Sequence, residues 1–317
     1  MNRIDILQEA IDLTSGDRNR KAGDFVTNHT NIAKIWSVIL GIEVQPHQVA
    51  LCMAGMKLAR CVASLDLDHF VDGAAYFAGA GECAQPDEPT VTSCIIVPSR
   101  GRPENITDLI HALHETQTDS DLVVVVDNDD AKLPEYQAID GCQLIVISSG
   151  PRGVVWPLNR GAQALLEWPY RHFIFMGDDH RPRTKNWDAI WRENLDELGT
   201  GIVYGDDLFQ SKGLPTQVGM TRNIVEALNG FVPAVFQHLY CDDFWLALGN
   251  DLEAIRYLPE TVIEHLHPVA GKAEWDDLYR QVNLPENYDI GRAQLKNYLA
   301  SEDYRELLNN LTITSST

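Results

Sequence analysis

Four short apolar runs, each ending in polar residues, constrain the fold of this sequence more than any other feature. They are CIIVPSR (94–100), LVVVVDNDD (122–130), LIVIS (144–148) and HFIFMGDD (172–179). Helical spacing marks the segments between them, notably ITDLIHALHE (106–115) and LNRGAQALLEW (158–168). β-branched runs that alternate with helices of about ten residues are typical of parallel βαβ units. We therefore expect an α/β domain with a mostly parallel, mixed sheet.

The polar ends of three of these runs are predicted to meet at one edge of the sheet. Ligands of open parallel sheets bind beyond the carboxyl ends of the strands. Those ends hold Ser99-Arg100, Asp127 to Asp130, and Asp178 to His180. Neither GxGxxG nor GxxxxGKS/T occurs in the sequence, which disfavours an ordinary dinucleotide or P-loop site. The prediction is one crevice lined by acidic and polar side chains.

The first 84 residues have a different pattern. Ile4, Leu7 and Ile11 recur at helical spacing, and three further helices are expected, one of them starting at Pro46. A Gly-, Pro- and acid-rich stretch without periodicity follows. We expect an all-α domain over 1–84, a linker over 85–93, an α/β domain over 94–275 and a helical extension over 276–317.

The chain is strongly acidic, and the charge is unevenly shared. Of a net charge of −21, residues 1–84 carry −3 (7 Lys+Arg against 10 Asp+Glu) and the rest carries −18 (18 against 36). Such a field repels phosphate backbones, so nonspecific nucleic-acid binding is not expected. Six cysteines without a CxxC pair fit reduced thiols. Because no apolar run approaches the roughly 18 residues of a membrane span and no signal-peptide pattern opens the chain, we expect a cytoplasmic protein without a membrane partner.

Asp178, Asp179 and His180 are the best candidate metal ligands. Carboxylate oxygens suit Mg²⁺ and Mn²⁺, and imidazole is compatible with Mn²⁺. Such an ion can bridge carboxylates to a diphosphate and neutralise a departing phosphate. A solvated acidic loop is the alternative, because Asp-Asp pairs also stand at 129–130, 206–207, 242–243 and 276–277. The pair at 206–207 ends a strand, where we expect a plain turn, with a position facing the acceptor as the alternative. We expect the pair at 276–277 on a solvated helix face.

The segment around Asp178 resembles nucleotide-sugar glycosyltransferases of the GT-A type, especially the large family-2-like group. In GVVWPLNRGAQALLEWPYRHFIFMGDDH (153–180), a Gly-initiated helix with Asn-x-Gly precedes a strand that ends in the metal motif. CIIVPSRGRPENI resembles that group's first strand and nucleotide loop, and VVVVDNDD resembles its second strand. The resemblance covers roughly residues 94–270. It implies a Rossmann-like GT-A fold, Mn²⁺ or Mg²⁺ as cofactor, and a UDP-, GDP- or CDP-sugar as donor.

Donor-binding residues follow from this resemblance and from the scarcity of basic side chains in the domain, which makes each arginine notable. Asp127 corresponds to the acid that meets the nucleobase or ribose in that group. Arginines hold diphosphate oxygens well, and an ordinary surface ion pair is the alternative for each of them here. The donor-binding set is Pro98, Ser99, Arg100, Arg102, Asp127, Arg152, Asn159 and Asp178.

One departure from the group adds further candidates. His180 stands where most members have Asp, and some GT-A enzymes combine this Asp-x-His version with a histidine late in the domain. His265 or His267 in EHLHP is then a further ligand, with an exposed turn histidine as the alternative. Asp242 and Asp243 begin a helix comparable to the one that carries the general base of inverting enzymes. Helix capping by Asp242 is the other interpretation, and the choice between inversion and retention stays open.

Residues 1–84 resemble small phage-type all-α domains related to MazG-like nucleoside triphosphate pyrophosphohydrolases. GDRNRKAGD, HQVALCMAGMKLARC and HFVDGAAYFAGAGE carry this resemblance. Active members bind magnesium through Glu-x-x-Glu and Glu-x-x-Asp pairs, whereas helices two to four here offer chiefly Glu43, Asp72 and Glu82. We therefore predict a non-catalytic module for docking or homo-oligomerisation, with hydrolysis or binding of a nucleotide as the alternative.

Three functions are compatible with these patterns. A metal-dependent glycosyltransferase is favoured by the combination of Asn-x-Gly, Asp-x-His, the later Asp pair and His-x-His. A nucleotidyltransferase or nucleotide hydrolase is one alternative, and a non-catalytic nucleotide-binding module is the other. The acceptor is unknown. The phage context implied by the N-terminal resemblance would make it a virion protein or a modified DNA base, and would place the protein in the host cytoplasm.

Overall fold

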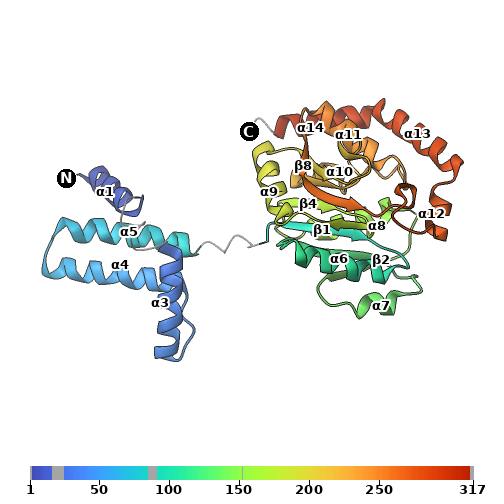
Figure 1. The fold of residues 1–317 in the computed structure, drawn as a ribbon. Coiled ribbons are helices and arrows are strands. Elements are labelled where there is room, and N and C mark those ends of the chain that lie inside the picture. Colours follow the sequence, from blue (N-terminus) through green and yellow to red (C-terminus); the bar gives the residue numbers. More distant parts are fainter. Residues whose placement is uncertain (1, 16–24, 85–90, 152, 315–317) are drawn as a thin grey trace. The chain divides into compact units, whose positions relative to one another are not determined.

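The chain consists of two compact units, Met1–Thr90 and Val91–Thr317. The structure is a computed structural model, and it describes residues 2–15, 25–84, 91–151 and 153–314. Each unit has its own secondary structure (Figure 1) and its own set of buried apolar residues. The order of an all-α unit followed by an α/β unit confirms the predicted fold class.

The first unit is helical. Its elements are α1 (Arg3–Ser15), α3 (Phe25–Leu40), α4 (Pro46–Ala63) and α5 (Leu67–Ala84). Pro46 occupies the first turn of α4, where its missing N–H needs no partner. The Gln45 N–H donates to Gln48 Oε1 at 2.9 Å and closes that end of the helix. Lys57 of α4 and Asp72 of α5 form an ion pair between the two longest helices.

The second unit is built on an eight-stranded mixed sheet. Its order is β3-β2-β1-β4-β7-β6-β8-β5. The strands are β1 (Ser93–Pro98), β2 (Asp121–Asp127), β3 (Gln143–Ile147), β4 (His172–Phe175), β5 (His180–Pro182), β6 (Ile202–Asp206), β7 (Val218–Thr221) and β8 (Ile255–His265). The pairs β1/β2, β1/β4, β2/β3 and β6/β8 are parallel. β7 runs antiparallel to β4 and β6, and β5 runs antiparallel to β8.

Helices cover both faces of this sheet because neighbouring residues of each inner strand enter opposite cores. In β1, Cys94 and Ile96 belong to one hydrophobic cluster, and Ile95 and Val97 belong to the other. The cluster around Ile95 packs against α6 (Pro103–Glu115) and α9 (Trp187–Leu198), and α7 (Leu133–Gln137) contributes its buried Tyr136. The cluster around Ile96 packs against α8 (Val155–Leu165), α10 (Arg222–Leu228), α11 (Cys241–Asp251) and α14 (Glu302–Thr314).

The C-terminal segment is part of the α/β unit and not a separate extension. α12 (Asp277–Val282) and α13 (Pro285–Leu299) lead into α14, whose Tyr304, Leu307 and Leu311 are buried in the main core. The boundary predicted at 275/276 therefore does not divide the fold. These three residues recur at helical intervals of three and four, but that spacing does not show which surface the helix packs against. None of the helices in the described residues has the length and apolarity needed to cross a membrane.

The strand ends deliver the candidate residues to one edge of the sheet. β1 ends at Pro98, β2 at Asp127 and β4 at Phe175, and parallel pairing places these ends together. A turn after β4 leads into the short β5, where His180 lies directly opposite His265 of β8 in antiparallel register. Two histidines far apart in the sequence thereby become cross-strand neighbours.

Candidate functional site

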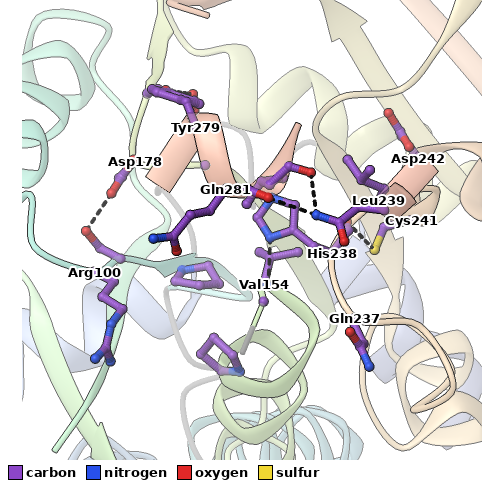
Figure 2. A pocket seen from close by; sticks show the side chains of 18 of the residues that line it. Arg100, Val154, Asp178, Gln237, His238, Leu239, Cys241, Asp242, Tyr279 and Gln281 are labelled. Atoms are coloured by element: carbon purple, nitrogen blue, oxygen red, sulfur yellow. Dashed lines mark hydrogen bonds between the residues drawn. The ribbon is translucent and has the colours of Figure 1, made fainter. Parts of the chain in front are cut away.

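A cavity of about 600 Å³ opens beyond the carboxyl ends of β1, β2 and β4. One side, which we call the strand wall, is formed by Pro98, Ser99, Arg100, Arg102, Asp127, Asp178, Asp179, His180, His265 and His267. The other side, the helix wall, is formed mainly by the loop before α11, the start of α11, and α12 and α13. It includes Gln237, His238, Cys241, Asp242, Tyr279, Gln281 and Gln294. Figure 2 shows Asp178 and Asp242 on opposite sides of this cavity.

Most of the residues predicted for the site line the cavity, and two do not. Asn159 and Asp243 are absent from its lining among the described residues. Arg152 lies outside the described residues. The crevice predicted from the strand ends therefore exists, and its two walls bring together residues from both halves of the α/β unit.

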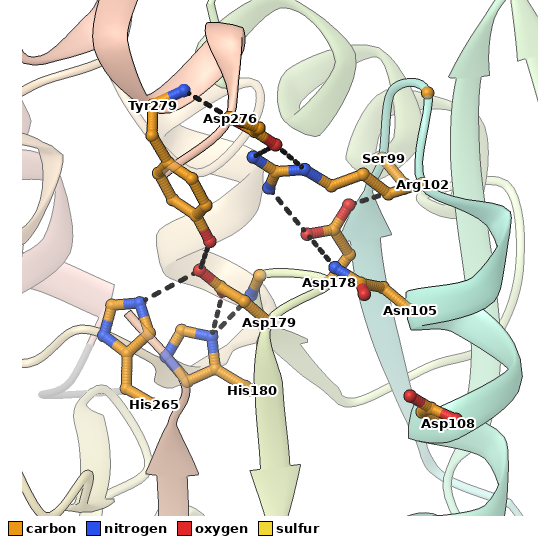
Figure 3. Close-up of polar contacts among 12 residues, drawn as sticks. Ser99, Arg102, Asn105, Asp108, Asp178, Asp179, His180, His265, Asp276 and Tyr279 are labelled. Atoms are coloured by element: carbon orange, nitrogen blue, oxygen red, sulfur yellow. Dashed lines mark hydrogen bonds and ion pairs between the residues drawn. The ribbon is translucent and has the colours of Figure 1, made fainter. Parts of the chain in front are cut away.

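Asp179, His180 and His265 form the metal-type cluster of the strand wall. Their ligand atoms lie within 4.8 Å of one another, and this is the one such group among the described residues. Asp179 Oδ1 is 3.3 Å from His180 Nδ1, and Asp179 Oδ2 is 3.3 Å from His265 Nε2 (Figure 3). The two imidazole rings stack with their centroids 4.2 Å apart, as the cross-strand register requires.

The electrostatics of this cluster suit a cation. Burial acts to raise the pKa of Asp179, but the two histidines outweigh it and hold that pKa well below its usual range. Burial lowers the pKa of His180, and the neighbouring His265 lowers it further. A carboxylate beside two imidazole rings is a donor set that fits Mn²⁺. The other ring nitrogen of His265, Nδ1, is buried, makes no hydrogen bond among the described residues and lies 3.9 Å from Asp207 Oδ2.

Asp207 holds the chain behind His265. Its Oδ1 accepts the N–H groups of Phe209, Gln210 and Ser211 at 2.7–2.9 Å, and its Oδ2 accepts the Thr216 hydroxyl at 2.9 Å. Its backbone C=O accepts the N–H of His265 at 3.0 Å. Burial acts to raise the pKa of Asp207, but these hydrogen bonds lower it overall, so the carboxylate stays charged. The turn expected at 206–207 is present, and it also positions a candidate ligand.

Asp178 has different surroundings from Asp179, although the two are adjacent. It accepts hydrogen bonds from Ser99 Oγ (2.6 Å), Arg102 Nη1 (3.4 Å) and Asn105 Nδ2 (3.5 Å). The turn after β4 sends the two carboxylates to opposite sides, as Figure 3 shows. Burial and the neighbouring Asp179 raise the pKa of Asp178 to about 6. Asp178 therefore faces the predicted donor-binding loop and is not one of the three clustered ligand groups.

Arg102 connects the strand wall to α12. Its Nε and Nη2 donate to Asp276 Oδ2 at 2.9 and 2.5 Å, and its guanidinium lies 4.2 Å from the centre of the Tyr279 ring. Asp276 also caps α12 by accepting the Tyr279 N–H at 2.8 Å. The Tyr279 hydroxyl donates to Asp179 Oδ2 at 2.6 Å. The Asp276 side chain is 44% exposed, as a solvated face would have it, but docking of α12 also brings it onto Arg102, which the sequence did not predict.

Arg100 is likewise already paired. Its Nη1 lies 3.0 Å from Asp127 Oδ2 and 2.7 Å from Asp129 Oδ1. Burial raises the pKa of Asp127, and Arg100 opposes that effect. Asp130 accepts the Gly101 N–H at 2.7 Å and so shapes the loop that follows β1. Arg100 and Asp127 both line the cavity and lie close together, as their shared donor-binding assignment requires.

Of the two candidate general bases, Asp242 and Asp243, only Asp242 lines the cavity. It lies in the first turn of α11, whose N-cap position is Tyr240, so Asp242 is not the capping residue. Its Oδ1 accepts the Asp243 N–H at 3.1 Å. Burial raises the pKa of Asp242 to about 6, with a further contribution from the charge of Asp243. A carboxylate whose pKa lies this near neutrality suits proton transfer.

Two residues have roles that sequence patterns did not indicate. Asn159, predicted to bind the donor, instead holds the loop after α10: its Oδ1 accepts the N–H groups of Phe231 and Val232, and its Nδ2 donates to the Val232 C=O at 2.7 Å. His238 lines the cavity, and its Nδ1 accepts the Val154 N–H at 3.2 Å. Burial lowers the pKa of His238 to about 4, so the ring is neutral near pH 7. No local motif marks His238 in the sequence.

Comparison with known proteins gives a family match for the helical unit and distant likenesses for the fold. A family described as "Domain of unknown function (DUF6378)" matches residues 5–84. No curated protein matches the chain. Among solved structures, the chain is similar to TarS of S. aureus, with 14% identity and a TM-score of 0.43, over 63% of this chain and 43% of TarS. This chain therefore spans less than half the length of TarS.

A second similar structure is the glucosyl-3-phosphoglycerate synthase of Mycobacterium tuberculosis, solved with Mn²⁺, uridine diphosphate and glucosyl-3-phosphoglycerate. It has 13% identity and a TM-score of 0.43, over 67% of this chain and 80% of that one. Likenesses with such TM-scores carry no functional conclusion for this chain.

Proposed function

We propose that this chain is a metal-dependent glycosyltransferase that moves a sugar from a nucleotide-diphosphate donor to a hydroxyl group of an acceptor. One observation carries the proposal. The Asp179–His180–His265 cluster and the Asp242 carboxylate line the same cavity from opposite walls. A cation site facing a carboxylate of near-neutral pKa is what a displacement at a diphosphate-linked carbon requires.

The strand wall is the donor side of the proposal. Asp179, His180 and His265 would hold Mn²⁺ or Mg²⁺, which neutralises charge on a departing diphosphate. Arg100 and Arg102 are the arginines of the described cavity lining and would contact the diphosphate oxygens. Asp127 would contact the ribose or the base. Because Arg102 is engaged with Asp276, donor binding exchanges one anion for another at this guanidinium.

The helix wall is the acceptor side. Asp242 takes the proton of the acceptor hydroxyl while that oxygen bonds to the anomeric carbon of the donor. The bond from this carbon to the diphosphate breaks, and the diphosphate leaves with the electron pair. A single base acting on the acceptor fits an inverting displacement. Gln237, Gln281 and Gln294 supply uncharged amide groups along this wall, which suits an uncharged, hydroxyl-bearing acceptor.

Donor hydrolysis with Mn²⁺ over UDP-, GDP- and CDP-sugars tests the proposal. We expect slow hydrolysis of one donor class, lost in Asp179→Ala and retained in Asp140→Ala, which removes an exposed acid outside the cavity lining. Turnover that survives Asp179→Ala would remove the metal assignment. Tight nucleotide binding with no hydrolysis, and with no transfer to any acceptor in a broad panel, would favour a nucleotide-binding module instead.

A further inference from the structure

The helical unit leaves most of its large apolar side chains in solvent. Twenty-six large apolar residues are exposed in the described part of the chain, and sixteen of them lie between Ile4 and Phe77. Val62 is 91% exposed, Val38 84% and Leu65 79%. Isolated exposed apolar residues are normal on a soluble protein, but a concentration of them in one small unit marks an interaction surface.

These residues form stripes along the helices. On α4 the stripe is Leu51, Gly55, Leu58 and Val62, and Leu65 follows just beyond the helix. On α5 it is Leu67, Phe70, Ala74, Phe77 and Gly81. Alternating intervals of three and four residues keep each set on one helix face, the spacing by which helices pack along a seam. A Cβ added at Gly55 or Gly81 would meet nothing within 4 Å, so both glycines leave space for another backbone.

The buried part of the unit is correspondingly small. Among its described residues, the buried apolar side chains are Ala10, Ala33, Val49, Ala50, Val71 and Ala80. None is larger than valine, whereas the α/β unit buries Trp187, Trp191 and Trp245. Ordering a chain is offset mainly by burying apolar surface. The helices of this unit therefore depend on a partner that covers their outer stripes.

The area involved is that of a stable protein interface. If each of the seven large apolar residues of the two stripes exposes about 100 Å², the total is on the order of 700 Å², compared with about 300–600 Å² for the largest patch of a typical monomer and about 800 Å² per partner in a standard interface. A surface of this size would be covered permanently. Its partner must be present whenever the chain is made, and a second copy of the chain meets that condition.

Charge favours the same partner. Residues 1–84 carry −3 of the net −21, so two copies repel each other least where their helical units meet. We infer that the helical unit is a self-association module in which the α4 and α5 stripes of one chain pack against those of a second copy. The inference is independent of the proposed reaction, because every residue of the cavity lies in the α/β unit.

Sedimentation equilibrium of the full chain, without added lipid, tests this inference. The wild type is expected at twice the 35.5 kDa chain mass at micromolar concentration. Val62→Glu places a charge in the α4 stripe and is expected to raise the dimer dissociation constant at least 100-fold. Val235→Glu makes the same change at an exposed valine of the α/β unit and should leave the mass unchanged. Leu58→Ala, which keeps a good helix former, should weaken the dimer less than Val62→Glu does.

Three results would overturn the inference. The first is a wild-type mass of one chain while amide exchange shows α4 and α5 protected. The second is a Val62→Glu protein that dimerises as the wild type does. The third is a monomer that floats with phosphatidylcholine vesicles, which would make a lipid surface the occupant. Donor hydrolysis by Val62→Glu at the wild-type rate would show that the effect is confined to association.

Discussion

The two walls of the cavity differ in how their charges are satisfied. On the strand wall, Arg100 contacts Asp127 and Asp129, and Arg102 contacts Asp178 and Asp276. On the helix wall, Asp242 has no ion-pair partner among the described residues, and burial raises its pKa to about 6. A paired wall is suited to exchange its partners for a charged ligand, whereas an unpaired carboxylate is suited to accept a proton. The predictions below test this division.

The largest effect is expected at Asp242. Asp242→Asn removes the base and should lower kcat/KM by about 10²–10⁴-fold, with little change in melting temperature because an amide oxygen at this position can still accept the Asp243 N–H. Asp243→Asn is the matched control, since Asp243 does not line the cavity. Steady-state transfer assays measure both. Equal losses in the two variants would contradict the assignment of the base to Asp242.

The dependence of kcat/KM on pH further separates the roles of Asp242 and Asp243. Because the pKa of Asp242 is raised to about 6, the carboxylate becomes protonated as the pH falls through that value, and kcat/KM should fall on the acid side. Asp243 contributes to the raised pKa, so Asp243→Asn should move this acid limb to lower pH. A limb that stays in place after Asp243→Asn would assign it to another group.

The Asn159→Ala variant tests whether the Asn159 amide stabilises the loop after α10 or binds the donor. Asn159→Ala leaves the backbone groups of Phe231 and Val232 without their partners, and should cost about 2–4 kcal/mol in the free energy of unfolding. Gln163→Ala, on the same helix, removes two exposed hydrogen bonds, one to the Asn229 C=O and one from Arg160, and should cost less than about 1 kcal/mol because water can replace both. Urea denaturation measures both. If Asn159→Ala instead weakens donor binding at unchanged stability, the donor-binding prediction was right.

The smallest effect is expected at Asp276, which connects α12 to Arg102 of the strand wall. Asp276→Asn keeps a good N-cap for α12. It removes the carboxylate that competes with the donor diphosphate for Arg102. Donor affinity should therefore rise about 2- to 10-fold, which corresponds to about 0.5–1.4 kcal/mol. Calorimetric titration of the nucleotide diphosphate with Mn²⁺ measures the change. A weaker affinity would mean that Asp276 helps to hold the bound donor.

Strand-scale features were predictable from the sequence, and contacts between distant segments were not. The apolar runs at 94–98 and 172–175 became β1 and β4 because their patterns are local. His180 and His265 were both named, but only the register of β5 against β8 selects His265 over His267 for the cluster. The role of Asp276 depends on where a polar C-terminal helix docks. Local periodicity contains no information about that position.

The same limit explains why the separate surroundings of Asp178, Asp179 and Asn159 could not be predicted from the sequence. A sequence places Asp178 and Asp179 side by side, and only the turn after β4 decides that Asp179 joins the histidines while Asp178 meets Ser99 and Arg102. Asn-x-Gly likewise fixes Asn159 on a helix without showing whether its amide points to a ligand or to a loop. In this chain it points to the loop.

The central claim is that Asp179, His180 and His265 bind a divalent cation, and direct Mn²⁺ titration tests it best. The wild type is expected to bind one Mn²⁺ per chain, measured by calorimetry and by the electron paramagnetic resonance signal of free Mn²⁺. Asp179→Ala and His265→Ala should each weaken binding at least about 100-fold. His267→Ala removes an imidazole that lines the cavity outside the cluster and should leave affinity nearly unchanged. Wild-type affinity in both Asp179→Ala and His265→Ala would contradict the claim.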